Sequence, residues 1–422
     1  MQGGGIPRVR GQSIPDVIIS FFPGSGMVLA AGGIAAQGLG AITGLLIARK
    51  IGPEGYGQYA IAFALVNSFV FTFLLGLDTV VVREVARYPS NAGKIISSAG
   101  FPAAVWSGSL VIIICLLGRG LGYSCALMHL VSIIALATAV KGLINLVRAG
   151  LRGFEKLGLD AMMQFFEAVL TLAFISIFLG IYGSAFSAAW GLLLSEVAAF
   201  GLSMCFLSRV SGPITAFNAG LAKRLIKAAV PIGLTFTLLG INLRLEMVVL
   251  GIYATRPEIG KYAAALSIVM LTRSLSLISA ALLPRLSTSY HQGLKAFLPI
   301  FKKGLGGITI LASAAGLIIF ILAEPMLLIL FGRDFIGGAE VLRTLAVMGA
   351  VMFVNTYLWQ AMIAMNSQSR MALAILVSLA VTGGLLIYLI PKFGIAGAAV
   401  ASLGREVCLA ILLSWFVFKR LL

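Results

Sequence analysis

Ten charged residues lie within apolar stretches of this sequence or at their ends, and they are the residues most able to do chemistry there. They are Lys141, Arg244, Arg273, Arg343 and Arg405, with Asp78, Glu167, Glu196, Glu246 and Glu406. A charge at bilayer depth costs on the order of 2.5 to 3.5 kcal/mol even on lenient scales, so it usually faces a partner or a wet cavity. Basic groups in such a cavity attract an anion, and the planar fork of Arg suits phosphate. The pattern therefore predicts a site for a phosphorylated or otherwise anionic substrate.

The apolar stretch at 127–147 carries the clearest polar face. At about 100° per residue, an arc of roughly eighty degrees collects Thr138, Lys141, Asn145, Arg148 and Arg152. Lys141 lies near the middle of the stretch, so we expect its ammonium group to face a cavity. Arg148 and Arg152 lie nearer the inner end, where snorkelling to the headgroups is an equal alternative.

The second half of the chain carries further candidates. In a regular helix Arg244 and Glu246 point roughly 160° apart, so they cannot both face one cavity. We expect one of them to face the cavity and the other to pair within its own lobe. Arg273 has no acid nearby in sequence and is expected in the cavity. For Arg405, beside Glu406, a structural ion pair is favoured.

Composition fixes the class of protein that must position these residues. Of 422 residues, 60% are hydrophobic and 11% are charged, and the mean hydropathy is +1.06. A water-soluble domain cannot be packed from such a chain, which is therefore an all-α polytopic membrane protein. Twelve apolar stretches are long enough to span a bilayer: 27–48, 57–79, 101–118, 127–147, 160–181, 185–207, 228–252, 261–284, 305–330, 341–364, 371–390 and 395–418.

Two internal echoes divide these spans into two sets of six. The string Pro53 to Ala60 returns as Pro257 to Ala263, and Gly183 to Ala188 returns as Gly394 to Ala399. Repeats at this spacing are typical of two-lobed transporters whose substrate site lies between the repeats. We expect a cytoplasmic segment, a first lobe, a cytoplasmic connector and a second lobe, at 1–26, 27–208, 209–226 and 227–422.

Basic residues set the expected orientation. With both termini in the cytoplasm, nineteen of the 31 Lys and Arg residues fall in inner segments and seven in outer ones, as the positive-inside rule requires. We expect a multi-pass protein of the plasma (inner) membrane. The net charge of +17 then reflects topology, and no nucleic-acid partner is expected.

Several activities are excluded by what the chain lacks. It has no Gly-x-x-x-x-Gly-Lys-Ser/Thr phosphate loop, and the expected outer loops carry no pair of acids that a membrane glycosyltransferase would need. Neither His129 nor His291 has the company of a metal site, so we expect no metal, no cofactor and no enzyme activity. Cys115 and Cys125 flank one outer loop, and free thiols are favoured over a bridge.

Motifs spread along nearly the whole chain resemble those of the polysaccharide-flippase family, the Wzx-like branch of the MOP (MATE-like) superfamily. They are Ala48 to Ala60, Gly76-Leu77-Asp78 with Arg83 to Ala86, Leu151 to Lys156, Gly260 to Ala265, Leu283 to Ser287 and Phe331 to Phe335. The resemblance implies two pseudo-symmetric six-helix bundles in a V that opens alternately to either side. It also implies a cationic cavity for the sugar-pyrophosphate head of a polyprenyl-linked glycan, carried outward for surface polysaccharide or glycoconjugate assembly.

The resemblance implies a role for each of the candidate residues. The expected substrate ligands are Lys141, Asn145, Arg148, Arg244, Arg273 and Arg405, and the candidates for coupling to a proton or sodium gradient are Asp78, Glu196 and Glu246. Expected partners are the lipid-linked glycan, membrane lipids, H⁺ or Na⁺, and glycan-assembly enzymes. Two alternatives share the fold: a lipid II-type flippase, which commonly has fourteen spans, and a MATE-type exporter of drugs or metabolites, which usually has an acidic cavity.

Overall fold

The computed structural model describes residues 24–211, 217–272, 279 and 282–421, and every regular element in them is helical. The predicted ligand Arg273 and most of the N-terminal segment lie outside the described residues. The α-helices are α2 (Gly24–Ser68), α3 (Leu77–Arg87), α4 (Ala92–Gly120), α5 (Cys125–Gly153), α6 (Leu157–Tyr182), α7 (Ala185–Ser211), α8 (Ala219–Asn242), α9 (Leu245–Tyr253), α10 (Arg256–Thr272), α12 (Leu283–His291), α13 (Leu294–Ile321), α14 (Ala323–Leu330), α15 (Ala339–Ala364) and α16 (Gln368–Leu421).

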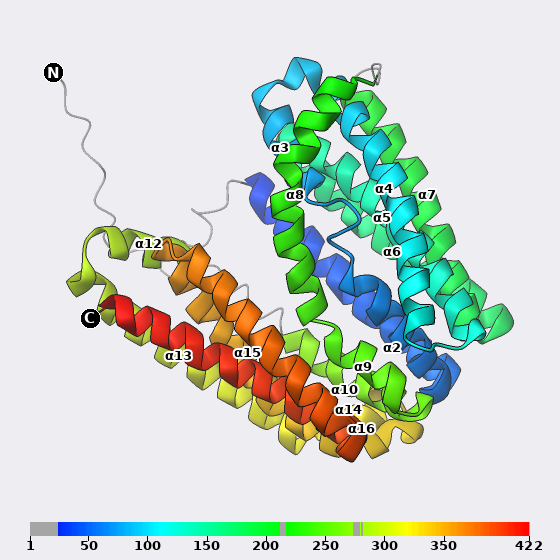
Figure 1. Ribbon diagram of the computed structural model, residues 1–422, viewed down its shortest axis with the longest axis vertical. Helices are drawn as coiled ribbons and strands as arrows, with labels where there is room; N and C mark the ends of the chain where they lie inside the picture. The colour runs from blue at the N-terminus through cyan, green and yellow to red at the C-terminus, as the bar shows by residue number, and fades with distance from the viewer. Residues whose placement is uncertain (1–23, 212–216, 273–278, 280–281, 422) are drawn as a thin grey trace.

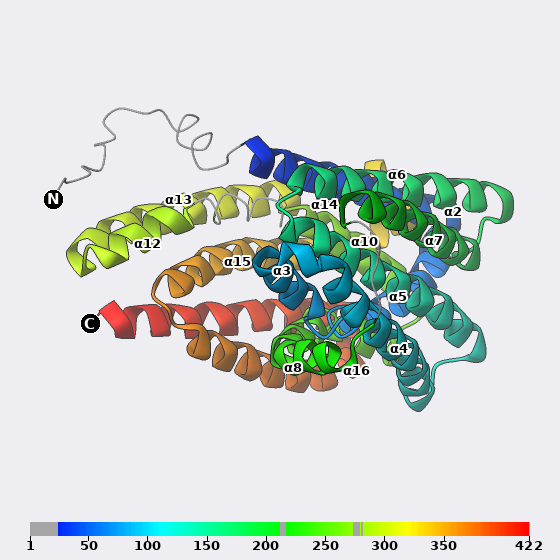
Figure 2. The same cartoon turned by 90° about the horizontal axis from the view of Figure 1, so that it is seen from above.

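The helices form two bundles (Figure 1). In the first bundle, α2, α4, α5, α6 and α7 pack against one another with α3, and in the second α10, α12, α13, α15 and α16 do so with α14. The bundles meet through α2 and α10. Figure 1 shows them diverging toward the ends that carry α3 and α12. Seen from above, α12 and α3 are likewise well separated (Figure 2).

The outer surface of the bundles is apolar, as a lipid-facing surface must be. Large aliphatic side chains point outward along α6, α13 and α16, and Ile310 leaves 74% of its surface exposed. Within the described residues, nine helices are long and apolar enough to cross a membrane. The prediction of an all-α polytopic membrane protein is therefore confirmed.

Glycine breaks explain why the two longest helices contain two predicted spans each. Gly52 in α2 has φ 67° and Gly394 in α16 has φ 54°, a left-handed region that only glycine enters readily. The predicted spans 27–48 and 57–79 lie on either side of Gly52, and 371–390 and 395–418 on either side of Gly394. Gly183, the sequence counterpart of Gly394, also has positive φ, at 55°.

The predicted span 57–79 is wrong as a single helix. It ends at Ser68, and α3 begins only at Leu77. Side chains from α4 satisfy the intervening backbone, because Trp106 Nε1 donates to the Thr72 carbonyl at 2.8 Å and Ser107 Oγ to the Phe73 carbonyl at 3.0 Å. Non-helical backbone at membrane depth is tolerated where protein groups replace the missing hydrogen bonds, and apolar periodicity does not reveal such groups.

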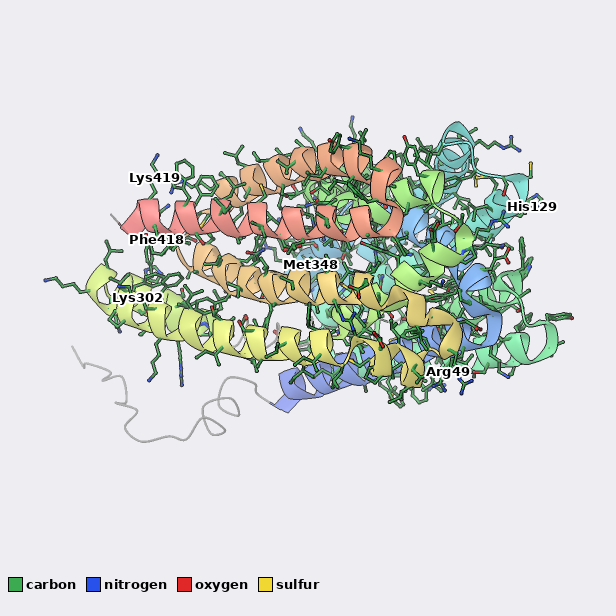
Figure 3. All side chains as sticks on the ribbon, turned by 90° about the horizontal axis from the view of Figure 1, so that it is seen from below. Arg49, His129, Lys302, Met348, Phe418 and Lys419 are labelled. Carbon is green, nitrogen blue, oxygen red and sulfur yellow. The ribbon has the colours of Figure 1, made fainter. Side chains whose placement is uncertain are left out.

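Four residues that the sequence assigns to opposite sides of the membrane lie at opposite ends of the molecule, and which end is cytoplasmic stays a prediction. Lys302 and Lys419, both predicted to be inner, lie at one end of the molecule, and Arg49 and His129, both predicted to be outer, lie at the other (Figure 3). Within the described part of the predicted connector, residues 209–211 end α7, residues 217–218 are not helical, and residues 219–226 begin α8. All four cysteines are free thiols.

The first sequence echo forms the contact between the bundles. A methyl group added at Gly57 would overlap the Arg256 carbonyl oxygen, and one added at Gly260 would overlap the Pro53 carbonyl oxygen. Two repeat-related glycines thus let α2 and α10 cross at backbone distance, as small residues do in membrane helix pairs. Nearby, Arg49 Nε donates to the Leu330 carbonyl at 2.6 Å, at the C-terminal end of α14.

Changing either crossing glycine to alanine should destabilise the protein. An alanine in a helix is ordinarily more stable than glycine, but Gly57→Ala and Gly260→Ala force two backbones apart, at a cost of about 1–3 kcal/mol. Thermal unfolding in detergent should show a lower midpoint for both variants. Gly44→Ala, in the same helix with open space around it, is the matched control and should unfold at or above the wild-type midpoint. An unchanged midpoint for Gly57→Ala would contradict the close crossing.

Candidate functional site

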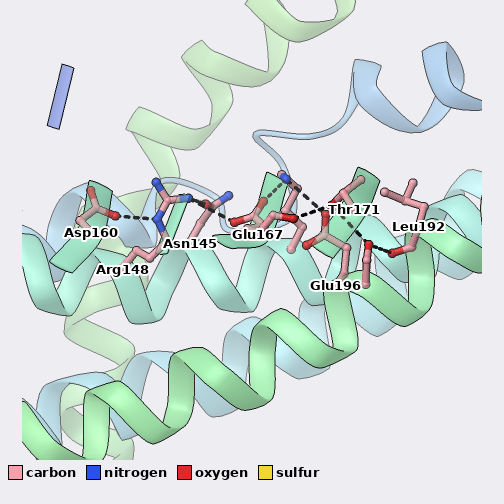
Figure 4. Close-up of polar contacts among 9 residues, drawn as sticks. Asn145, Arg148, Asp160, Glu167, Thr171, Leu192 and Glu196 are labelled. Carbon is pink, nitrogen blue, oxygen red and sulfur yellow. Dashed lines mark hydrogen bonds and ion pairs between the residues drawn. The ribbon is translucent and has the colours of Figure 1, made fainter. Parts of the chain in front are cut away.

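The polar face of α5 meets a cluster of acids inside the first bundle (Figure 4). Three cations of α5 are within 4.0 Å of carboxylates on α6 and α7. We call this set the α5 cluster: Lys141, Arg148 and Arg152 with Asp160, Glu167 and Glu196. Its formal charges balance, so the cluster as a whole is neutral.

Lys141 joins the two glutamates near the middle of the bundle. Its ammonium group donates to Glu167 Oε1 and, at 3.3 Å, to Glu196 Oε1. Glu196 Oε2 is buried with no hydrogen-bond partner in the described structure. The predicted ligand Lys141 and the predicted coupling residue Glu196 are thus in direct contact.

Arg148 holds the inner half of the α5 cluster together. Its Nε donates to Asp160 Oδ1 at 2.6 Å, and its Nη1 donates to Asn145 Oδ1 at 3.2 Å and lies 3.5 Å from Glu167 Oε2. Arg152 Nε lies 4.0 Å from Asp160 Oδ2. Arg148 is therefore paired within the bundle and does not reach for the headgroups.

Two cations of the α5 cluster are more exposed than its three acids. The Lys141 side chain is 42% exposed and that of Arg152 is 35% exposed, whereas the three acidic side chains are at most 9% exposed. Because α5 packs against α2, α3, α4, α6 and α7, this exposed strip does not lie on the outside of the bundle. The neutral cluster consequently presents a cationic surface.

A second charged cluster is sealed inside the second bundle. Arg405 Nη1 lies 3.1 Å from Glu246 Oε2, and Arg405 Nε lies 3.3 Å from Glu406 Oε1. All three side chains are at most 6% exposed. Asn355 Nδ2 donates to Glu406 Oε2 at 2.9 Å, and the Asn242 carbonyl accepts from Arg405. The ion pair expected for Arg405 is present, so in this conformation Arg405 presents no surface to a substrate.

The assumption of a regular helix around Arg244 and Glu246 is wrong. The chain leaves helical geometry between Asn242 and Leu245, and Arg244, at φ −128°, immediately precedes α9. Glu246 is the member of the pair that is buried in its own bundle, and Arg244 is half-buried. Before this break in the chain, α8 packs on α3 and α4. After it, α9 packs on α16.

The remaining candidate lies apart from both clusters. Asp78 is in the first turn of α3 and half-buried, and it forms no ion pair within the described structure. Its predicted role in ion coupling stays a prediction. Among the described residues no group of His, Cys, Asp or Glu is arranged to hold a metal ion.

Sequence reasoning missed Asp160 and Gln164, although a signal was present. On α6, Asp160, Gln164, Glu167 and Thr171 fall within an arc of about sixty degrees, and this stripe faces the cationic stripe of α5. Gln164 Nε2 donates to Asp160 Oδ2 at 3.4 Å. Complementary stripes on successive helices predict such a contact, which a search for single charges overlooks.

Neutralising Asp160 should destabilise the first bundle more than neutralising an exposed acid does. Asp160→Asn removes the carboxylate beside Arg152 and leaves Arg148 with its 3.5 Å contact to Glu167. Breaking a buried ion pair costs about 3–5 kcal/mol. Chemical unfolding in bicelles should therefore show a large loss of stability. Glu340→Gln is the matched control, because Glu340 is 82% exposed beside Arg343, and it should leave unfolding unchanged. Equal effects of the two substitutions would refute the structural role of Asp160.

Comparisons of structure identify the fold. The chain is similar to an inward-facing multidrug resistance MATE family transporter of the MOP superfamily, with a TM-score of 0.70 and 16% identity over 96% of this chain and 98% of that one. Lipid II flippase MurJ, in an inward closed conformation, gives a TM-score of 0.70 and 18% identity over 93% of this chain and 87% of that one.

A third similar structure is a MOP superfamily transporter from Pyrococcus furiosus, whose binding pocket is described as having reverse polarity. Its TM-score is 0.65, with 14% identity over 94% of each chain. A comparison with curated proteins finds no match. Residues 25–290, more than half of the chain, match the model of the polysaccharide biosynthesis protein family. The chain therefore belongs to this family, and it has the fold of the MOP superfamily structures.

Proposed function

We propose that this protein is a flippase that moves polyprenyl-(pyro)phosphate-linked oligosaccharide from the cytoplasmic to the outer leaflet, for surface polysaccharide or glycoconjugate assembly. The observation that carries the proposal is the polarity of the α5 cluster, in which Lys141 and Arg152 are partly exposed and the acids are buried. An anion that approaches this surface meets Lys141 and Arg152 first. Phosphate on a lipid carrier is an anion that a member of a polysaccharide biosynthesis family would meet.

The architecture that we propose for transport has twelve crossings in two lobes of six. The breaks at Gly52 and Gly394 turn two of the nine long helices into four spans, and α10 supplies a further one. With both termini in the cytoplasm of a plasma membrane, the divergent ends in Figure 1 face inward, and the substrate head would enter there. Alternating access would then carry it past the Gly57–Gly260 crossing.

Coupling to an ion gradient is assigned to the buried acids that contact the cations. Glu196 in the α5 cluster and Glu246 beside Arg405 are both buried, and Asp78 is the third candidate. Protonation or Na⁺ binding at Glu196 would release Lys141 from one of its two carboxylates, making its ammonium group more available to phosphate. The Lys141 side chain would thus take part both in coupling to the ion gradient and in substrate binding.

A MATE-type exporter of organic cations is the alternative that shares the fold. Such a substrate needs exposed acids, whereas the described acids of both clusters are at most 9% exposed. The Lys141 ammonium group would then face a substrate that is also positively charged. The polarity of the surface favours the anionic substrate over the cationic one.

Depletion of the protein should cause completed lipid-linked glycan to accumulate on the inner leaflet. We expect wild type to restore transfer, measured by labelling glycan from outside the cell, and Lys141→Met to reduce the restored transfer at least about tenfold, because a charge-assisted contact to phosphate is lost. Unchanged labelling after depletion would overturn the proposed function.

Two variants separate the loss of a cation from the loss of the fold. Lys141→Met combined with Glu167→Gln removes one charge of each sign, so the cluster stays neutral, and it should be present in the membrane at normal abundance yet remain inactive. Arg343→Gln removes a cation at the far end of α15, paired with Glu324 and Glu340, and should be active. Full activity of the double variant would remove Lys141 from the substrate site.

A further inference from the structure

An apolar pocket of about 510 Å³ lies away from both charged clusters, at the seam between the bundles. One wall consists of Leu65 and Ser68 of α2 with Ile113 and Leu117 of α4, and the other contains Leu245 and Val248 of α9. Neither the proposed transport reaction nor the charged clusters use this pocket.

Water has little reason to occupy this pocket. Ser68 supplies the one polar side chain among its described lining residues, and its hydroxyl donates to the Ala64 carbonyl at 2.9 Å. A buried water needs two to four polar partners. Leu117, on the α4 wall, is 44% exposed, so the pocket opens to the surroundings of a membrane-spanning helix. An apolar chain from the bilayer is the occupant that suits these walls.

The length of the pocket along α4 fits within one leaflet of the bilayer. Its lining on α4 runs from Ile113 to Gly120, which is about 10 Å along a helix, against a hydrocarbon half-thickness of about 15 Å. Gly120 ends α4, and α5 begins after a short turn at Cys125. His129, near the start of α5, lies at the same end of the molecule as Arg49 (Figure 3). The pocket therefore extends from that membrane surface toward the bilayer centre.

A cation lies at the same end of α4 as the pocket. Arg119 is exposed in the last turn of α4, next to Gly120. A guanidinium group at headgroup level attracts phosphate. The charge and the apolar walls together fit one amphiphile, an anionic phospholipid of the leaflet on that side, with its phosphate at Arg119 and one acyl chain inside.

The pocket also adjoins the break between α8 and α9. Ile241 and Leu245, on either side of that break, both line it. We propose that one acyl chain of an anionic phospholipid from this leaflet occupies the pocket and stabilises the α8–α9 break in the observed conformation. The lipid is thus a structural ligand, whatever substrate the transporter carries.

The test measures lipid binding to the purified full-length protein by native mass spectrometry and by thermal unfolding. We expect the wild type to retain phosphatidylglycerol about fivefold better than phosphatidylcholine of the same chains, and phosphatidylglycerol to raise its unfolding midpoint. Leu117→Trp, which fills the pocket, should lose both effects while staying folded. Arg119→Gln should remove the preference between the two headgroups and keep the binding of the chain.

The matched control places the same bulky side chain on another lipid-facing helix. Leu317→Trp on α13, where Leu317 is 59% exposed, should retain phosphatidylglycerol as the wild type does. Undiminished binding by Leu117→Trp would overturn the site, and equal retention of both lipids by the wild type would overturn the headgroup contact. Preferential retention of a polyprenyl phosphate would assign the pocket to a transported lipid instead. None of these outcomes depends on flipping, so this inference and the proposed function can fail separately.

Discussion

Unpaired charge is not tolerated at bilayer depth, and this constraint organises both bundles. Among the described residues, each bundle has a buried charged cluster. In the first, Glu196 accepts a hydrogen bond from Lys141 on α5, and in the second, Glu406 accepts one from Asn355 on α15. The helices around each cluster are held by partners that hydrocarbon cannot replace. Apolar packing between helices is far less directional, so the ionic contacts fix which faces of α5, α6 and α7 meet.

The hydrocarbon of the bilayer also constrains the backbone. Residues 69–76 leave helical geometry in the middle of a predicted span, and Trp106 and Ser107 replace the hydrogen bonds that the helix no longer supplies. Within this stretch, the Thr72 hydroxyl shares a hydrogen bond with that of Thr237 on α8 at 2.7 Å. The irregular segment of the first bundle is therefore joined to α8, whose own break follows at residues 243–244. Two interrupted segments, one in each of two neighbouring helices, are thus linked to each other.

Much of this arrangement could be predicted from the sequence, and the failures have physical reasons. Periodicity and the echoes predicted the helical class, the polar stripe of α5 and the repeat that brings Gly57 to Gly260. The end of α2 at Ser68 could not be predicted, because the groups that satisfy it lie over thirty residues away on α4. The break before Arg244 was missed for a similar reason: a regular helix was assumed where tertiary contacts decide the geometry. Asp160 was missed, although the spacing of the polar residues on α6 places it on the same face as Glu167.

The two clusters differ in one respect that bears on transport. Both have more than one carboxylate around a cation, yet the first leaves Lys141 and Arg152 partly exposed and the second seals Arg405 from every side. A cation that already has two carboxylate partners binds phosphate only if the phosphate replaces or supplements them. Lys141 can meet that condition because it is exposed, whereas Arg405 would first have to leave its bundle, exposing two acids to a low-dielectric interior. Under the proposed function, the first bundle is therefore the one that would bind the substrate phosphate.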